Sequence, residues 1–230
     1  MADFIHDILN KIYLTFIVDD RYLFFVEGLK NTLLLTFVSF LLGTTFGIVL
    51  CALQRCKNTA VNRITRFITS VLIEMPTMVL LMILVYIIFG RTVLPVLWIV
   101  TFGLTLKAGA YLSEIFNTAL STVAEGEIEA ARTLGMNKWQ AFFNVVLPQT
   151  IESAMPLYIN QFIVSMQETS VVGYLAIVDL TRAASIISSR TMDAFFGIIT
   201  VTIIYFIIGY IAKLFFRKLG ERNRERGVSA

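Results

Sequence analysis

The chain has 230 residues with a formal net charge of +3; 57% of the residues are hydrophobic and only 15% are charged. A mean hydropathy of +0.78 excludes an ordinary soluble domain and indicates an integral membrane protein.

The N-terminal segment, residues 1–21, has an amphipathic pattern. Apolar side chains recur at helical spacing from Phe4 to Ile17, which is typical of a helix that lies in the membrane interface. The segment has neither a positively charged start nor a small-residue cleavage site, so we expect no removable signal peptide.

Five apolar windows follow, each with about 20 residues, the length that a helix needs to cross the hydrocarbon core. They are Thr32–Leu53, Phe67–Phe89, Leu94–Phe116, Pro156–Val178 and Ala194–Phe216. Helices are expected because they satisfy their backbone polar groups internally, where no water is present. The sequence therefore predicts an all-α membrane protein with five spans in a transmembrane domain at 22–216 and a basic tail at 217–230.

The basic residues predict how these spans are oriented. If the first span runs from outside to inside, the inner segments and the C-terminal end carry twelve Lys and Arg residues, and the outer segments carry six. Basic residues are enriched on the cytoplasmic side of membrane proteins. We therefore expect the N-terminus outside, the C-terminus inside, and the basic tail against the lipid surface rather than on nucleic acid.

Catalytic signatures are not found along the chain. There is no phosphate-binding loop, zinc motif or nucleophile elbow, the only histidine is His6, and Cys51 and Cys56 have the spacing of packing residues. We expect no catalytic residue, no metal site and no cofactor in this chain. If it moves a solute uphill, the energy comes from elsewhere.

A polar segment, residues 119–150, interrupts the apolar chain between two spans. Ser121 or Thr122 can cap a first short helix, and Asn137 can start a second one. Gly135 can supply a left-handed turn between them. The pattern predicts two short helices around a tight corner, a feature that we call the elbow.

Pro148 is expected to break the chain between the elbow and the next span. The residues alone leave an alternative open, because an ordinary amphipathic surface loop has a similar composition.

The types and spacing of seven residues in the elbow resemble a known motif. The motif EAA-x3-G-x9-I-x-LP of ATP-binding cassette (ABC) importer permeases is matched, with Val for Ile, by Glu129, Ala130, Ala131, Gly135, Val145, Leu147 and Pro148. Further stretches resemble the amino-acid-type permeases of the polar amino acid uptake group: "GAYLSEIF" from Gly109, "NQFIVSMQETSVVG" from Asn160 and "DLTRAASIISSRT" from Asp179.

This resemblance implies a function and a set of partners. The elbow would be the coupling helix that docks on a cytoplasmic ATPase, which binds ATP and Mg²⁺ and tilts the spans between outward-open and inward-open forms. The resemblance also implies a second permease copy or a paralogue, an extracytoplasmic solute-binding protein, surrounding lipids, and a location in the prokaryotic inner membrane.

Ionisable residues inside spans are costly and mark candidate functional sites. Lys107 and Glu168 lie near the middle of two spans, and helical spacing places Tyr111 and Glu114 on the same face as Lys107. Further polar residues near Glu168 are Gln161, Thr169 and Ser170.

Two interpretations of these residues remain open. In the first, an amino acid binds along a substrate pathway, with its ammonium group at Glu168 and its carboxylate at Lys107. In the second, the two residues form a structural ion pair, because burying either charge alone would cost several kcal/mol.

One stretch departs from the resembling permeases. Where these typically read Arg-Gly-Thr-Pro-Leu, this chain has Ile73-Glu74-Met75-Pro76-Thr77. The Glu74 carboxylate could favour a cationic solute, or it could pair with Arg66 or Lys107.

Two other function classes compete with the importer subunit. An ion-gradient-driven carrier would use Lys107 and Glu168 as an ion relay. A membrane scaffold would use the elbow to bind a soluble partner without transport.

Overall fold

The computed structural model of the protein describes the backbone of residues 2–228 and the side chains of residues 6, 9–216 and 218. Its described residues form helices and connecting turns without a β-strand. The predicted all-α class is thus confirmed. The α-helices are α1 (Ala2–Phe16), α2 (Tyr22–Gln54), α3 (Thr59–Glu74), α4 (Thr77–Met82), α5 (Val96–Ser121), α6 (Glu125–Thr133), α7 (Lys138–Ala141), α8 (Leu147–Glu168), α9 (Leu180–Thr191) and α10 (Ala194–Val228).

Four tighter or wider helical turns join these helices. The 3₁₀ turns are η1 (Val18–Asp20) and η4 (Thr169–Leu175), and the π-helical turns are η2 (Ile83–Ile88) and η3 (Phe142–Val146).

Five helical units of the described chain are long and apolar enough to cross a membrane, provided that each bent pair counts as one span. Three are single helices, at Val18–Gln54, Val96–Ser121 and Ala194–Phe216. The other two are bent: α3 meets α4–η2 at 107°, and the helix from α7 through η4 meets α9 at 47°. These five units correspond to the five predicted windows.

Local backbone breaks account for the two bent units. Pro76 follows Met75 in extended backbone and ends α3, because a residue before proline is disfavoured in the helical region. After Glu168 the chain tightens into η4, and Ala176 then adopts a left-handed conformation before α9 begins. Helix α9 lies beyond the predicted window, which ended at Val178, and was not expected as a separate helix.

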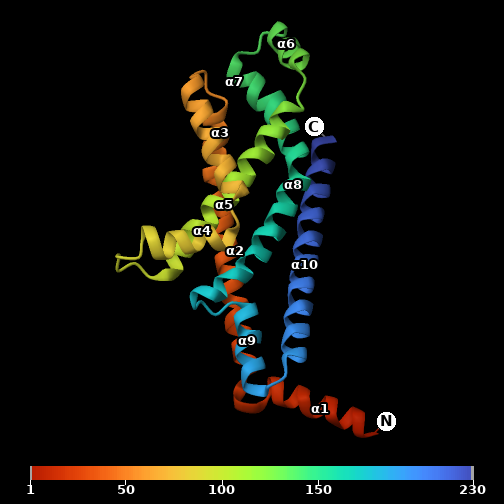
Figure 1. Cartoon of the computed structure of the whole chain (residues 1–230). Coiled ribbons are helices and arrows are strands. Elements are labelled where there is room, and N and C mark those ends of the chain that lie inside the picture. The colour runs from red at the N-terminus through yellow and green to blue at the C-terminus, as the bar shows by residue number, and fades with distance from the viewer. Residues whose placement is uncertain (1, 229–230) are drawn as a thin grey trace.

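Helices α2 and α5 form the centre of the bundle (Figure 1). Two glycines of α2, spaced four residues apart, allow this close approach. A Cβ atom at Gly43 would lie 2.9 Å from the Cβ of Ala108, and one at Gly47 would lie 2.9 Å from the carbonyl oxygen of Gly109. Small residues at this spacing let membrane helices pack backbone to backbone.

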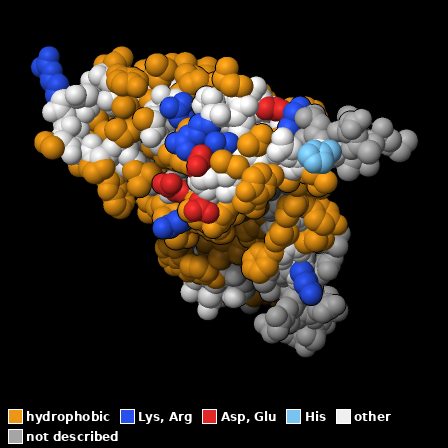
Figure 2. All heavy atoms as spheres, turned by 90° about the horizontal axis from the view of Figure 1, so that it is seen from below, with side chains coloured by type: hydrophobic (Ala, Val, Ile, Leu, Met, Phe, Trp, Pro, Cys, Tyr) orange, Lys and Arg blue, Asp and Glu red, His pale blue; other side chains and the backbone are white. Residues whose placement is uncertain are grey.

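The two ends of the molecule differ in character (Figure 1). One end carries α6, α7 and the C-terminal part of α10, and the other carries α1 and the turn between α9 and α10. Seen from the α1 end, acidic and basic side chains gather in the middle of the surface while hydrophobic side chains cover the flanks (Figure 2).

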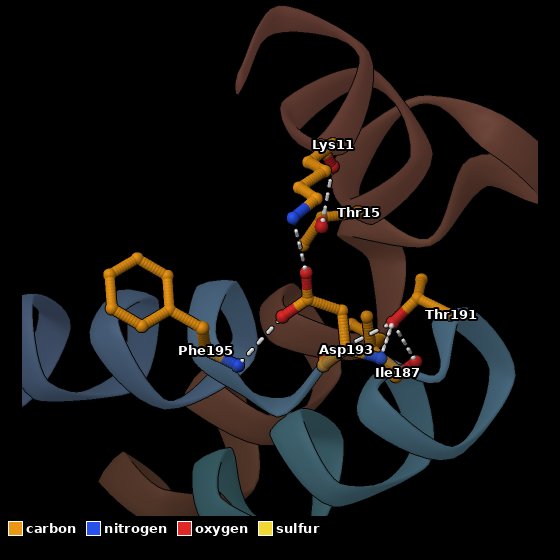
Figure 3. Close-up of polar contacts among 6 residues, drawn as sticks. All are labelled: Lys11, Thr15, Ile187, Thr191, Asp193 and Phe195. Carbon is orange, nitrogen blue, oxygen red and sulfur yellow. Dashed lines mark hydrogen bonds and ion pairs between the residues drawn. The ribbon is translucent and has the colours of Figure 1, made fainter. Parts of the chain in front are cut away.

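Helix α1 lies across its end of the bundle and is tied to the turn before α10 (Figure 3). The ammonium of Lys11 lies 3.5 Å from Asp193 Oδ2, and the other carboxylate oxygen of Asp193 accepts a hydrogen bond from the Phe195 N–H at 2.9 Å. Asp193 therefore caps α10 and anchors α1 at once. The first apolar residues of the predicted stripe, Phe4 and Ile5, lie outside the described side chains, as do most side chains of the basic tail.

Candidate functional site

The corner of the elbow is a Schellman motif that closes α6. The Gly135 N–H donates to the Arg132 carbonyl at 3.1 Å, and the Met136 N–H donates to the Ala131 carbonyl at 3.2 Å. Gly135 has φ +86°, and nothing lies within 4 Å of the position that a Cβ would occupy. Backbone conformation, rather than lack of space, is thus the reason for glycine at this position. The predicted left-handed turn is confirmed.

The second helix of the elbow begins with a capping box. The Asn137 carboxamide oxygen accepts from the Gln140 N–H at 2.9 Å, and the Gln140 side chain accepts from the Asn137 N–H at 2.8 Å. This reciprocal pair satisfies two N–H groups that have no partner inside the helix. The prediction that Asn137 starts the second helix is confirmed.

Two details of the predicted elbow were wrong. Neither Ser121 nor Thr122 caps α6, because Thr122 is helical at the end of α5 and its hydroxyl donates back to the Ala119 carbonyl at 2.7 Å. The N-cap is Ala124, which makes no side-chain cap.

Pro148 does not break the chain either. It lies in the first turn of α8, where a missing N–H costs no hydrogen bond of that helix, and the π-helical turn η3 joins α7 to α8 ahead of it. The elbow therefore passes into the next span as continuous helical chain, which suits a rigid lever.

The motif residues of the elbow divide into inward-facing and outward-facing sets. Ala131 is buried and Leu147 is half-buried, whereas Glu129, Ala130 and Pro148 are exposed.

Contacts beyond the motif fix the elbow and leave its tip uncovered. The Gln149 amide donates to the Glu127 carboxylate, which ties α6 to the first turn of α8. At the tip, directly after the last residue of α6, Leu134 is 81% exposed. Apolar side chains presented in this way on a polar segment are typical of a protein contact surface.

Lys107 meets the broken helix in the middle of the bundle. Its side chain is 3% exposed, and its ammonium donates to the carbonyls of Leu72 at 3.1 Å, Ile73 at 2.9 Å and Met75. Because Pro76 has no N–H and α3 ends here, these carbonyls lie at the negative end of the helix dipole. A cation from α5 thus caps α3 inside the membrane.

Glu168 meets the same break from the other side. Its Oε1 accepts a hydrogen bond from the Thr77 hydroxyl at 3.0 Å, at the start of α4. Within the described residues Lys107 and Glu168 form no ion pair with each other. The structural ion pair considered from the sequence is absent in this conformation, because each charge has a partner in the α3–α4 break.

The other predicted pathway residues are only partly gathered at this break. The Lys107 ammonium lies 5.4 Å from the centre of the Tyr111 ring, a cation–π contact. Thr169 donates to the Met166 carbonyl at 2.7 Å where α8 tightens into η4, and half-buried Ser170 follows it.

Three further predicted residues differ in burial. Buried Gln161 contacts Ser165 within α8, with 3.5 Å between its Nε2 and the hydroxyl oxygen, and Glu114 is exposed. Glu74 is also exposed, but as the last residue of α3 it lies directly at the break.

Sequence reasoning missed Thr77 as a member of this site. Its signal was its place directly after Pro76, where a hydroxyl or carboxylate partner at the start of a helix is common. A cavity of about 220 Å³ lies next to the break, between α4–η2 and η4. Its lining is mainly apolar, with the aromatic rings of Tyr86 and Tyr174, and none of the predicted pathway residues lines it.

Comparison with known proteins decides the family. Residues 32–225 match the family described as "Binding-protein-dependent transport system inner membrane component". The chain belongs to this family. It is therefore the membrane-spanning permease component of a binding-protein-dependent transport system, and its place is the inner membrane. This confirms the resemblance on which the sequence analysis relied.

Individual relatives are similar to this chain over most of its length. The chain is 30% identical to a "Putative glutamine transport system permease protein GlnP" of Rickettsia typhi over 207 residues, covering 86% of this chain and 94% of the relative. It is 28% identical to the "Probable amino-acid permease protein YxeN" of Bacillus subtilis over 190 residues, covering 81% and 85%.

Solved structures agree with the fold. The structure described as an amino acid ABC transporter with histidines matches with a TM-score of 0.79 and 29% identity, covering 86% of this chain and 94% of the other. An inward-facing methionine ABC transporter, MetNI, matches with a TM-score of 0.73 at 21% identity, covering 90% and 99%, and it supports the fold alone.

Proposed function

We propose that this permease is the transmembrane subunit of an ATP-driven importer for amino acids or similar small polar solutes. The family match and the names of its relatives support this assignment. The observation that carries it is the elbow, whose Gly135 corner and capped second helix make a rigid protrusion next to the spans. An ion-gradient-driven carrier has no need of such a feature.

Coupling through the elbow follows from its geometry. A partner ATPase would bind the tip around Leu134 and the exposed residues Glu129 and Ala130. Closure of the ATPase dimer on ATP and Mg²⁺ would push on α6. The Glu127–Gln149 contact and the continuous helix through Pro148 would carry that displacement into α8.

Cargo would pass near the α3–α4 break, where α8 also changes into η4. Glu168 is half-buried and has one hydrogen-bond partner, Thr77, so its second carboxylate oxygen can accept the ammonium group of an amino acid. The Lys107 ammonium is already used by three backbone carbonyls. We therefore assign Lys107 the role of holding the break in place beside the pathway, with Tyr111, Gln161, Thr169 and Ser170 as further pathway residues.

The remaining partners follow from the same proposal. One permease chain does not enclose a pathway, so a second copy or a paralogue completes the pore, together with two ATPase subunits. A solute-binding protein delivers cargo at the end that carries α1. With the elbow facing the ATPase, the N-terminus lies outside and the C-terminus inside, in agreement with the distribution of basic residues.

Co-purification followed by reconstitution tests the proposed function. An ATPase is expected to co-purify with the permease. After reconstitution of the complex in liposomes, the rate of ATP hydrolysis should rise when a binding protein and an amino acid are added. Uptake by the permease alone, driven by a proton or sodium gradient, would overturn the proposal. Partner binding without any solute uptake would favour the scaffold.

A further inference from the structure

A second cavity lies between the elbow and the ends of the spanning helices. Its volume is about 400 Å³. Its apolar walls come from α5, α6, α7 and η3 and consist of Leu120, Ile128, Ala141, Phe142 and Val146. Two of these, Ala141 and Val146, are buried, so the floor of the cavity is a hydrophobic surface within the protein.

Three basic side chains complete the lining of this cavity: Arg55, Arg132 and Lys138. No carboxylate is among the described residues that line it. All three side chains are exposed, which places positive charge around an apolar floor. A ligand that matches this surface has an anionic head and an apolar body.

Hydrogen bonds fix only one of the three cations. The Arg55 guanidinium donates to the Asn117 carboxamide oxygen at 2.9 Å and to the Ser121 hydroxyl at 2.7 Å, which holds it at the end of α5. Within the described part of the chain, Arg132 and Lys138 have no hydrogen bond or ion pair from their side chains. Two cations therefore remain available for an anionic ligand beside a third that is already oriented.

The aromatic side chains beside the cavity match the depth of phospholipid headgroups. Trp139 and Phe143, next to the lining residues on α7 and η3, are exposed and stack with their ring centres 6.2 Å apart. Aromatic side chains of this kind gather at membrane–water interfaces. In Figure 1, α7 lies near the level of the N-terminal end of α3, whereas α6 extends beyond it.

We propose that this cavity binds the phosphate headgroup of an anionic phospholipid, with the start of its acyl chains against the apolar floor. Basic pockets between membrane helices on the cytoplasmic side are suited to such headgroups. The bound lipid would neutralise Arg132 and Lys138 and pack between the elbow and α5. This role is independent of the solute that the permease carries.

Native mass spectrometry of the purified full-length permease tests this site. Phosphatidylglycerol and phosphatidylethanolamine with identical acyl chains are added in competition. One phosphatidylglycerol should be retained in preference, and combining Arg132→Gln with Lys138→Gln should weaken that preference roughly 25-fold. The matched control combines Lys57→Gln with Arg63→Gln, two exposed cations at the same end that do not line the cavity. It should bind like the wild type.

Four results would overturn the proposal. The first is equal retention of the two lipids, and the second is an equal loss of preference in the control variant. The third is displacement of the lipid by millimolar inorganic phosphate, which would make the site one for a soluble anion. The fourth is loss of the lipid when the ATPase binds, together with weaker ATPase binding by the cavity variant, which would assign the cations to the partner protein. Circular dichroism of each variant checks that it remains folded.

Discussion

The hydroxyl of Thr77 donates a hydrogen bond to the carboxylate of Glu168 across 3.0 Å. It joins the start of α4, directly after the helix break, to the last residue of α8. Lys107 meets the other side of the same break through three carbonyls of α3. The Lys107 ammonium thus lies at the negative end of α3, where the helix dipole favours a cation.

Replacing Glu168 by Gln keeps the side-chain shape and a hydrogen-bond acceptor but removes the charge. If Glu168 accepts the ammonium of an amino acid, the charge-assisted bond is lost, at a cost of about 2 kcal/mol, which is roughly a thirtyfold weaker apparent affinity. Uptake into proteoliposomes as a function of amino acid concentration measures this.

The matched control for Glu168 is Glu27→Gln, an exposed carboxylate of α2 that should leave uptake unchanged. A Glu168→Gln permease that transports with normal affinity but melts at a lower temperature would show that the residue supports the break and does not bind cargo.

Replacing Lys107 by Met should destabilise the permease itself. The substitution leaves the carbonyls of Leu72 and Ile73 without the buried donor that satisfies them. An unsatisfied buried polar group costs about 1–3 kcal/mol, so we expect a clear fall in the melting temperature of the purified protein.

The melting temperature of Lys30→Met serves as the reference, because Lys30 is an exposed lysine of α2. Should Lys107→Met melt like the wild type and yet lose all uptake, Lys107 would contact the cargo, and the role assigned to it here would be wrong.

Replacing Gly135 by Val should uncouple the transporter. A β-branched residue in the left-handed region is strained by about 1–2 kcal/mol, so the corner between α6 and α7 should open. The expected result is normal membrane insertion with loss of the ATP hydrolysis that binding protein and solute stimulate.

Gly126 supplies the control for that change. It lies within α6, and nothing occupies the position of its missing Cβ, so Gly126→Ala should retain coupling. Gly135→Asn should also retain most of it, because Asn tolerates a left-handed conformation. Full stimulation in Gly135→Val would contradict the lever.

The sequence predicted local features best where the chemistry of one residue decides them. Gly135 and Asn137 each have a strong local preference, and both were placed correctly. The capping role of Thr122 failed because the end of α5 already uses its hydroxyl. The break at Pro148 failed because a π-helical turn precedes it and allows the helix to continue.

The groups that satisfy the buried charges across the bundle could not be predicted from the sequence. Lys107 and Glu168 were correctly singled out as costly charges, but which groups satisfy them depends on a 107° bend between α3 and α4. That bend brings backbone carbonyls next to the Lys107 ammonium. Every residue has a backbone carbonyl, so such acceptors cannot be recognised from residue types in the sequence. Helix α9 was missed because the predicted window ended at Val178, although Leu180, Ala183 and Ile187 are buried at helical spacing and Asp179 caps the helix.

The exposed tip of the elbow gives the most direct test of ATPase docking. Leu134 is 81% exposed and follows the last residue of α6. Burying such a side chain on binding contributes about 1.5–3 kcal/mol, so Leu134→Ser should weaken ATPase association about tenfold or more without altering the fold. Met192→Ser, at a residue that is 91% exposed in the turn between α9 and α10, is the control. Co-purification and ATPase titration in nanodiscs measure the difference. Equal association of both variants would mean that the ATPase docks away from the tip, because a contact centred on Leu134 cannot lose this side chain without losing affinity.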